Sequence, residues 1–282
     1  MKKLITLMLT FVLAVTACIS LAACGNTNKP VVVDGLVLAE EQYGIAAKKG
    51  NDALVSKINE ALISIADDEM QTIATKYGLT SEIAVKNDTV NPLAAASDDS
   101  WTNLVSRNKV VIGYTVFAPI AYEVVEDVPT KGYDIELAKA VFEYLNETYS
   151  SNIVVEFLEI DWNAKETMLE GGSIDLVWNG LTITQERIDN MCISVPYLYN
   201  KQVAVVLNQN ANKYKTIESM KDAIVGAEDG SAGEEQIQSK NIGKEYVACD
   251  SQLQAYQQLK TKTLDVIVID SVMANYYISM EK

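Results

Sequence analysis

Apolar runs of strand length alternate with segments of helical periodicity through most of the chain. The strand-like runs occupy 110–114, 153–159, 174–178, 202–207, 224–227 and 266–269. Between the first two, apolar residues recur on one helical face: Ile135, Ala138, Val141, Phe142 and Leu145. Such alternation of strands and helices predicts an α/β fold with mainly parallel sheets covered by helices.

Several helix ends carry residues that favour a start or a stop. Asp161 and Ser251 precede helical patterns and are good N-caps. Near the front, either Asn51 or Asp52 is expected to cap a helix. A second helix in this region is expected to end at Gly78, because glycine readily adopts the left-handed conformation of a helix stop.

Residues 89–100 interrupt this pattern. They contain Pro92, three consecutive alanines and the polar run 97–100. This composition is typical of a linker.

The first 23 residues predict a secretory signal. Lys2 and Lys3 precede a long apolar run that contains no acid. The sequence LAACG at 21–25 resembles a lipoprotein cleavage box, which makes Cys24 the expected lipidated N-terminus and 24–30 a polar tether. The earlier Cys18 fits such a box less well, and an uncleaved signal anchor remains the alternative.

Composition excludes several classes of function. The formal net charge is −15, which argues against a nucleic-acid partner. Histidine is absent, so Ser-His-Asp triads, Cys-His pairs and histidine-ligated metal sites are excluded. No paired cysteine spacing suggests zinc, and we expect neither a metal nor a cofactor.

The most specific motif lies at 178–187 and reads WNGLTITQER. It resembles the amino-acid-binding loop of the bacterial extracellular solute-binding proteins of family 3. The resemblance implies that the Gly180 carbonyl and the Thr182 hydroxyl accept from an α-ammonium group, and that the Thr182 N–H and Arg187 hold the α-carboxylate. A guanidinium suits this role because it offers two parallel donors. The alternative is a surface arginine paired with Glu186 or Asp189.

Two further segments match ligand-binding positions of that family. The glycine-rich turn at 226–235 follows a strand and opens a helix, where free N–H groups attract a carboxylate. The resemblance assigns a second carboxylate contact to Ser231 and the Ala232 N–H, although a plain tight turn is the alternative. Asp270 ends a strand and matches the carboxylate that pairs with the ammonium; its alternative role is an N-cap.

Aromatic and acidic positions complete the expected site. Phe117 and Trp162 match the two aromatic residues that enclose the ligand side chain. Tyr114 and Glu228 fall near positions that contact the end of that side chain. Because Glu228 is an acid, it favours a polar or cationic ligand.

The order of the segments differs from the ordinary order of the family. The sequence EEQYGIAAKKG at 40–50 resembles the family's last crossover strand, whereas VIGY at 111–114 resembles its first strand. Joining residue 282 to residue 31 restores the usual order, so we interpret the chain as a circular permutation. A truncated tandem gene is the alternative.

The resemblance therefore implies a type II periplasmic-binding-protein-like fold with two lobes and two hinge strands. The larger lobe is expected to combine 44–88 with 101–199. The smaller lobe is expected to combine 31–43, which includes the second hinge strand, with 200–282. The chain crossings are expected near 39–43 and near 197–201, and Cys192 and Cys249 fall in different lobes, which argues against a disulfide.

By this resemblance the protein is a secreted monomer, lipid-anchored to the outer face of the membrane, that captures an amino acid for the permease of an ATP-binding cassette (ABC) transporter. It is not expected to be an enzyme. Two alternatives remain: a dehydratase that acts on prephenate-like acids through Glu228 or Asp270, and a sensory module that docks to a membrane receptor.

Overall fold

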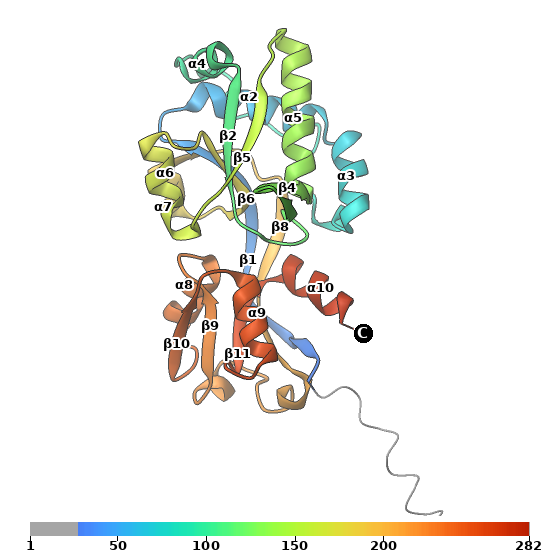
Figure 1. Ribbon diagram of the computed structural model, residues 1–282, viewed down its shortest axis with the longest axis vertical. Coiled ribbons are helices and arrows are strands. Elements are labelled where there is room, and N and C mark those ends of the chain that lie inside the picture. The colour runs from blue at the N-terminus through green and yellow to red at the C-terminus, as the bar shows by residue number, and fades with distance from the viewer. Residues whose placement is uncertain (1–27, 282) are drawn as a thin grey trace, which may run out of the picture.

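The protein has two α/β lobes joined by two long strands, as Figure 1 shows. The structure is a computed structural model that describes residues 28–281. The joining strands are β1 (Pro30–Lys48) and β8 (Leu198–Leu207). The predicted signal peptide, Cys24 and most of the predicted tether lie outside the described residues.

The sheet of the larger lobe is centred on β2 (Lys109–Tyr114), which pairs in parallel with β5 (Val154–Glu159) and β6 (Leu176–Thr182). The second half of β1 adds to β6 in the antiparallel direction. Short strands form a hairpin, β3 (Tyr122–Val125) and β4 (Val128–Lys131), and an edge contact, β7 (Met191–Ile193). The helices are α2 (Asp52–Ser64), α3 (Glu69–Tyr77), α4 (Ser100–Arg107), α5 (Tyr133–Tyr149), α6 (Lys165–Gly171) and α7 (Gln185–Asn190).

Alternate residues of β1 enter the two hydrophobic layers of this lobe, because successive side chains of a strand point to opposite faces. Ile45 and Ala47 join the core formed with α2, α3 and α5, whereas Ala46 packs on the side of α6. Both faces of the sheet are therefore covered, as the alternating sequence pattern predicts.

The smaller lobe repeats this arrangement around β9 (Ile224–Glu228). Its parallel neighbours are β10 (Glu245–Cys249) and β11 (Val266–Asp270), and β11 pairs with β8. The helices α8 (Ala232–Lys240) and α9 (Gln252–Lys260) contribute to opposite hydrophobic clusters, and α10 (Ser271–Met280) follows β11.

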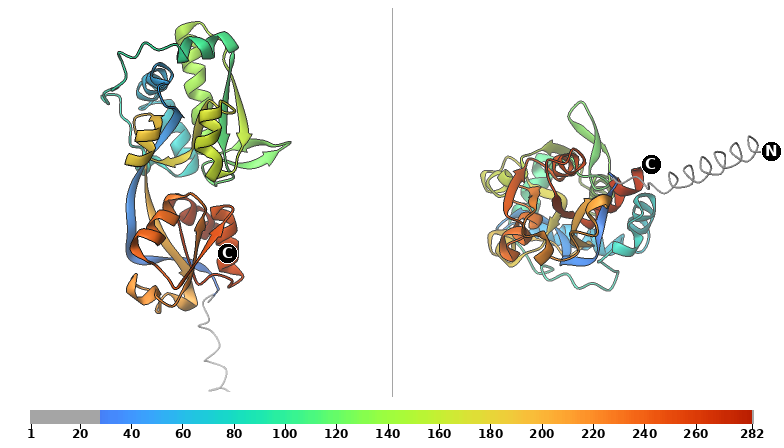
Figure 2. Two further views of the ribbon diagram at one scale, coloured as in Figure 1. Left: turned by 90° about the vertical axis from the view of Figure 1, so that its left-hand side faces the viewer. Right: turned by 90° about the horizontal axis from the view of Figure 1, so that it is seen from below.

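The two joining strands pair with each other where the chain passes between the lobes. Glu41 faces Asn200, and Tyr43 faces Leu198, in an antiparallel ladder. In the left view of Figure 2, β1 (blue) and β8 (orange) run between the lobes along one side of the molecule. The prediction of mainly parallel pairing thus holds within each lobe and is wrong for β1 and β8.

The front segment of the chain belongs to both lobes. The first half of β1 pairs with β8 in the smaller lobe, whereas α2 and α3 pack against α5 in the larger one. Near the other end of the described chain, the Lys29 ammonium donates to the Glu281 carbonyl oxygen at 3.0 Å. The two ends of the described chain therefore lie together on the smaller lobe.

The predicted linker is mostly exposed, yet it is attached to α2. The Asp98 carboxylate accepts from the Ala53 N–H at 2.7 Å, and the Ser100 hydroxyl accepts from the Leu54 N–H at 2.9 Å. The cap predicted from Asn51 or Asp52 is wrong, because the side chain at that position makes no capping bond. The long-range partners satisfy the free N–H groups of this helix start instead.

The other predicted helix ends are confirmed. The Asp161 carboxylate accepts from Asn163 N–H, the Ser251 hydroxyl accepts from Gln254 N–H, and Gly78 has a φ of 70°. Both cysteines described by the structure, Cys192 and Cys249, are buried free thiols.

Within residues 28–281, no helix combines the length and the apolar character needed to cross a membrane. In the same part of the chain, no group of three or more acidic or cysteine side chains is arranged to hold a metal ion.

Candidate ligand-binding site

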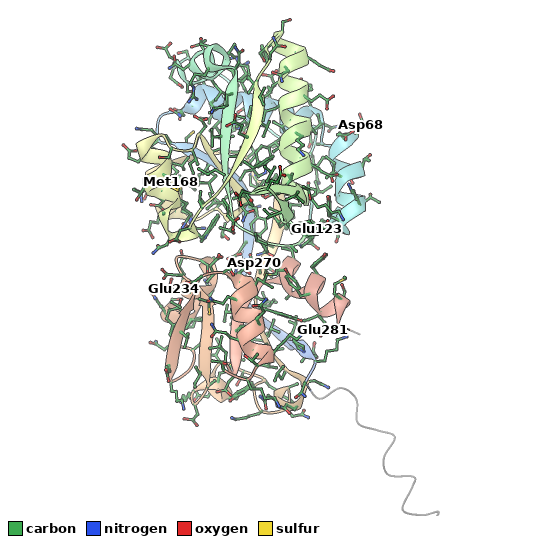
Figure 3. The ribbon with its side chains drawn as sticks, in the orientation of Figure 1. Asp68, Glu123, Met168, Glu234, Asp270 and Glu281 are labelled. Carbon is green, nitrogen blue, oxygen red and sulfur yellow. The ribbon has the colours of Figure 1, made fainter. Side chains whose placement is uncertain are left out.

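A small cavity lies between the lobes and receives side chains from both. Figure 3 places Asp270 at the edge of the smaller lobe that faces the larger one. The cavity is lined by Thr115, Phe117, Trp162, Asn179, Gly180, Thr182, Arg187, Glu228, Ser231, Ala232, Gln252 and Asp270. Every residue predicted to bind the ligand, with the exception of Tyr114, lies in this lining.

Arg187 is the cationic side chain of the cavity. It projects from α7 and is 4% exposed. Its guanidinium donates to the Thr182 carbonyl at 2.8 Å and to the Gly230 carbonyl at 3.4 Å, and it lies 3.9 Å from the Glu235 carboxylate. The alternative of a surface arginine is therefore excluded. Because these contacts use few of its five N–H donors, the guanidinium can still bind an anion.

Asp270 is the acidic counterpart on the opposite lobe. Its carboxylate accepts from the Tyr43 hydroxyl and from the side-chain amides of Asn200, Gln202 and Gln252. Burial raises the pKa of this carboxyl, although the hydrogen bonds oppose the shift. Its side chain makes no capping bond to α10, so the N-cap alternative is not observed. A bound cation would stabilise the ionised form.

The start of α8 forms a third wall. The Ser231 hydroxyl caps the helix by accepting from the Glu234 N–H at 3.2 Å, and Ala232 is the first helical residue. Gly233 follows, and a β-carbon there would lie 2.7 Å from the Val268 carbonyl oxygen. Glycine thus allows the helix start to approach β11, and the free N–H groups of the first turn favour an anion.

The loop that carries Gly180 is fixed by a buried acid. Asp134 accepts from the Gly180 N–H at 2.9 Å and from the Tyr197 hydroxyl at 2.7 Å. Burial raises the pKa of Asp134 to about 7. Gly180 itself has a φ of 63°, a left-handed conformation that glycine adopts without strain.

Two aromatic side chains contribute apolar surface to the cavity. Phe117 and Trp162 are both almost completely buried in the cavity wall. Behind Trp162, the Lys165 ammonium lies 5.0 Å from the ring centroid and donates to the Trp162 and Gly230 carbonyls, each at 3.2 Å. Burial lowers the pKa of Lys165 to about 8, and the neighbouring Arg187 acts in the same direction.

Hydrogen-bond acceptors gather at a further part of the wall. Burial, with a smaller effect of Asp270, raises the pKa of Glu228 to about 8. The Asn179 amide donates to the Thr115 hydroxyl at 2.8 Å, while its own carbonyl oxygen is buried without a partner. A ligand with N–H donors would satisfy these groups.

Tyr114 is the prediction that the structure corrects. It lies outside the cavity, where its ring packs with Ala121 and Ile135 and meets Phe157 edge to face at 6.3 Å. Successive residues of an extended segment point to opposite sides, so the neighbouring Thr115 reaches the cavity instead.

The sequence interpretation missed a polar layer behind the cavity. It consists of Glu41 and Tyr43 from β1 and Asn200 and Gln202 from β8. The sequence does contain a sign of this layer: Asn200 and Gln202 are alternate polar residues of one strand, so their side chains lie on the same face. Their partner on β1 is distant in sequence, which hides the group as a whole.

The lobes touch each other around the cavity. The Asn163 amide donates to the Asp229 carboxylate at 2.9 Å, and both Lys165 and Arg187 reach the Gly230 carbonyl across the gap. This arrangement encloses the cavity.

Residues 110–270 match the family of bacterial extracellular solute-binding proteins, family 3, which is more than half of the chain. The chain belongs to this family. Its fold is accordingly of the type II periplasmic-binding-protein class, as the resemblance of the motifs predicted.

Similar proteins include the L-cystine-binding protein TcyJ of Escherichia coli (strain K12), which is 24% identical over 180 residues. That match covers 63% of this solute-binding protein and 65% of TcyJ, slightly less than two thirds of its length.

Solved structures with the same fold include an ABC uptake transporter substrate binding protein from Streptococcus pneumoniae with bound histidine. It is 34% identical, with a TM-score of 0.58, over 65% of this chain and 74% of that one. The ancestral amino acid-binding protein AncCDT-1, a precursor of cyclohexadienyl dehydratase, is 27% identical with a TM-score of 0.58, over 64% of this chain and 77% of that one.

Proposed function

We propose that this protein captures a free amino acid outside the cell and presents it to the permease of an ABC importer, without performing chemistry. The observation that carries the proposal is the pair Arg187 and Asp270, buried on opposite sides of one cavity. A zwitterion carries a carboxylate for the first and an ammonium for the second. A ligand held by both lobes favours their closure.

The proposed orientation follows from the charges of the wall. The α-carboxylate binds Arg187 and the N-terminus of α8, where Ser231 and Ala232 lie. The α-ammonium binds Asp270, the Thr182 hydroxyl and the Gly180 carbonyl. Phe117 and Trp162 enclose the side chain.

The proposed ligand has a polar or cationic side chain. The unpartnered Asn179 carbonyl oxygen is a buried acceptor in this cavity, and Glu228 in the same wall becomes one when a cationic side chain stabilises its ionised form. A guanidinium, ammonium or imidazole group would supply N–H donors to both groups. The histidine bound by the Streptococcus pneumoniae relative agrees with this class.

The proposed location is the outer face of the cell membrane. The basic start, apolar run and LAACG box at 21–25 support a lipid anchor at Cys24. The anchor and the permease are proposals that rest on the sequence motif and on the family. A mass measurement of the protein from a native membrane extract, compared with a Cys24→Ser variant, tests the lipid.

We also propose that the chain is circularly permuted. The segment 31–88 supplies a hinge strand to the smaller lobe and two helices to the larger one, which complements the block at 101–282. The contact between Lys29 and Glu281 supports a continuous path between the two blocks.

A dehydratase is the second candidate. The observation that favours it is Glu228, whose raised pKa keeps it protonated near neutral pH, as a general acid requires. Incubation with arogenate and prephenate, followed by detection of the aromatic product, tests this alternative. The Arg187 and Asp270 pair favours simple binding.

The experiment that tests the proposed function is a thermal-shift screen of the purified protein against the L-amino acids, including ornithine and citrulline. A ligand at 100 times its Kd should add about 2.7 kcal/mol to the free energy of unfolding. Absence of a shift with every amino acid contradicts the proposal. Comparison of arginine with citrulline isolates the charge of the side chain.

A further inference from the structure

A second carboxylate lies beside the proposed ammonium site, on the joining strand β1. Glu41 is 9% exposed. Its Oε2 accepts from the Thr182 hydroxyl at 3.2 Å, from the Asn200 amide at 2.9 Å and from the Gln202 amide at 3.1 Å. Both of these amides also donate to Asp270, so the two carboxylates share their donors.

The bond to Thr182 decides how its hydroxyl is oriented. An ionised carboxylate only accepts, so the single hydroxyl proton of Thr182 must point at Glu41. The lone pairs of the hydroxyl oxygen are then free to accept from an ammonium in the cavity. A protonated Glu41 can instead donate to that oxygen, which leaves the hydroxyl proton pointing toward the ammonium.

The charged surroundings of Glu41 favour uptake of a proton while the cavity is without a cation. Asp270 on β11 shares amide donors with Glu41. Glu235 on α8 lines an adjoining groove together with Glu41. Arg187 on α7 is the cation that interacts with both Glu41 and Asp270. Burial, followed by the charge of Asp270, raises the pKa of Glu41 to about 7.

We propose that Glu41 is a positioning residue of the ammonium site, which binds the ligand tightly when Glu41 is a carboxylate and weakly when it carries a proton. This inference rests on the proposed function. Ammonium binding then expels a proton from Glu41, and the affinity for the amino acid rises with pH.

Thermodynamic linkage gives the direction and the size of this pH dependence of the affinity. The bound ammonium stabilises the carboxylate, so the pKa of Glu41 falls on binding and the proton is released. With a starting pKa of about 7, half of the Glu41 side chains carry a proton at pH 7. The Glu41 contribution to release at that pH is therefore about 0.5 proton. Compared with the fully ionised form, protonation of Glu41 weakens the affinity about thirtyfold at pH 5.5.

The test is titration calorimetry with the L-amino acid that gives the largest shift in the screen. Each titration is repeated at pH 7 in two buffers with different ionisation enthalpies, which yields the number of protons released. Glu41→Gln should release about 0.5 proton fewer than the parent and bind with a flatter pH profile. Asp270 and Glu228 also titrate, so only the difference between variants is used.

The matched control is Glu40→Gln on the same strand. Glu40 has a largely exposed side chain that lies 3.8 Å from Lys201, and this variant should keep the proton release and pH profile of the parent. Thermal unfolding without ligand establishes that each variant is folded. If Glu41→Gln does not fold, Glu41→Met serves, since it also removes the titrating carboxyl and keeps a side chain of similar length.

A second arm uses Thr182→Val, which removes the hydroxyl. If Glu41 acts through that hydroxyl, Glu41→Gln should change affinity much less in the Thr182→Val background than in the parent. Equal proton release by parent and Glu41→Gln, or equal effects in both backgrounds, overturns the inference and leaves the proposed function intact. Failure of the parent to bind any amino acid overturns both.

Discussion

Replacing Arg187 by methionine should separate ligand binding from folding. Methionine is apolar, unbranched and of comparable length, so it can fill much of the same space. In the parent, Arg187 is the one buried guanidinium, and its bonds go to the Thr182 and Gly230 carbonyls. The variant removes the proposed partner of the ligand carboxylate and leaves the rest of the cavity wall in place.

The two expected effects differ in size. Loss of one partner of a buried charge pair costs about 2–5 kcal/mol of binding free energy, which raises Kd about 30-fold to several thousandfold. Without ligand, the Thr182 carbonyl loses its donor, at about 1–3 kcal/mol. Removing a desolvated guanidinium offsets this by a similar amount. The free energy of unfolding of the unliganded protein should thus change by less than about 2 kcal/mol.

Titration calorimetry of the parent and variant measures the first effect, and thermal unfolding without ligand measures the second. Arg107→Met is the control, because Arg107 is the other arginine of the chain and pairs with Asp175 on the surface at 2.6 Å. It should bind like the parent. A Kd for Arg187→Met within threefold of the parent contradicts the assignment of the carboxylate site.

Three other results are expected. Glu228→Gln should lower the affinity for arginine relative to citrulline, because it removes a buried acid from the cavity; calorimetry with both ligands checks this, and an unchanged ratio contradicts it. A reordered chain, 101–282 joined to 31–88 by a short flexible linker, should fold and bind the same ligand. The change in loop closure should alter its free energy of unfolding by only about 1 kcal/mol relative to the parent; if it fails to fold, the permutation is wrong. The free energy of unfolding of the unliganded protein should fall as pH rises from 5 to 8. The folded pKa values of Asp134 and Glu41 are about 7 and that of Glu228 is about 8, all above their ordinary values. These groups therefore favour the folded state when protonated, and that stability is lost as they ionise. Chemical denaturation at both pH values measures this, and a rise in the free energy of unfolding would refute it.

The sequence by itself determined the elements and most of the cavity wall. Short apolar runs bounded by polar residues became β2, β9 and β11, because a strand covered on both faces needs apolar side chains at every position. The motif at 178–187 brought Gly180, Thr182 and Arg187 together, since they are close in sequence and are shaped by one strand-to-helix turn.

The tertiary structure alone decided which distant groups complete the site. Glu41 meets Asp270 only because β1 and β8 lie side by side between the lobes, and no local pattern records a pairing across more than 150 residues. The cap of α2 came from Asp98 for the same reason. Even within a strand, motif matching can fail. It predicted that Tyr114 lies near the cavity, but side chains alternate between the two faces of the strand, and Tyr114 points to the core face, where it packs against Phe157. Local chemistry sets which groups are available, and the antiparallel pairing of the two joining strands sets which of them share a cavity.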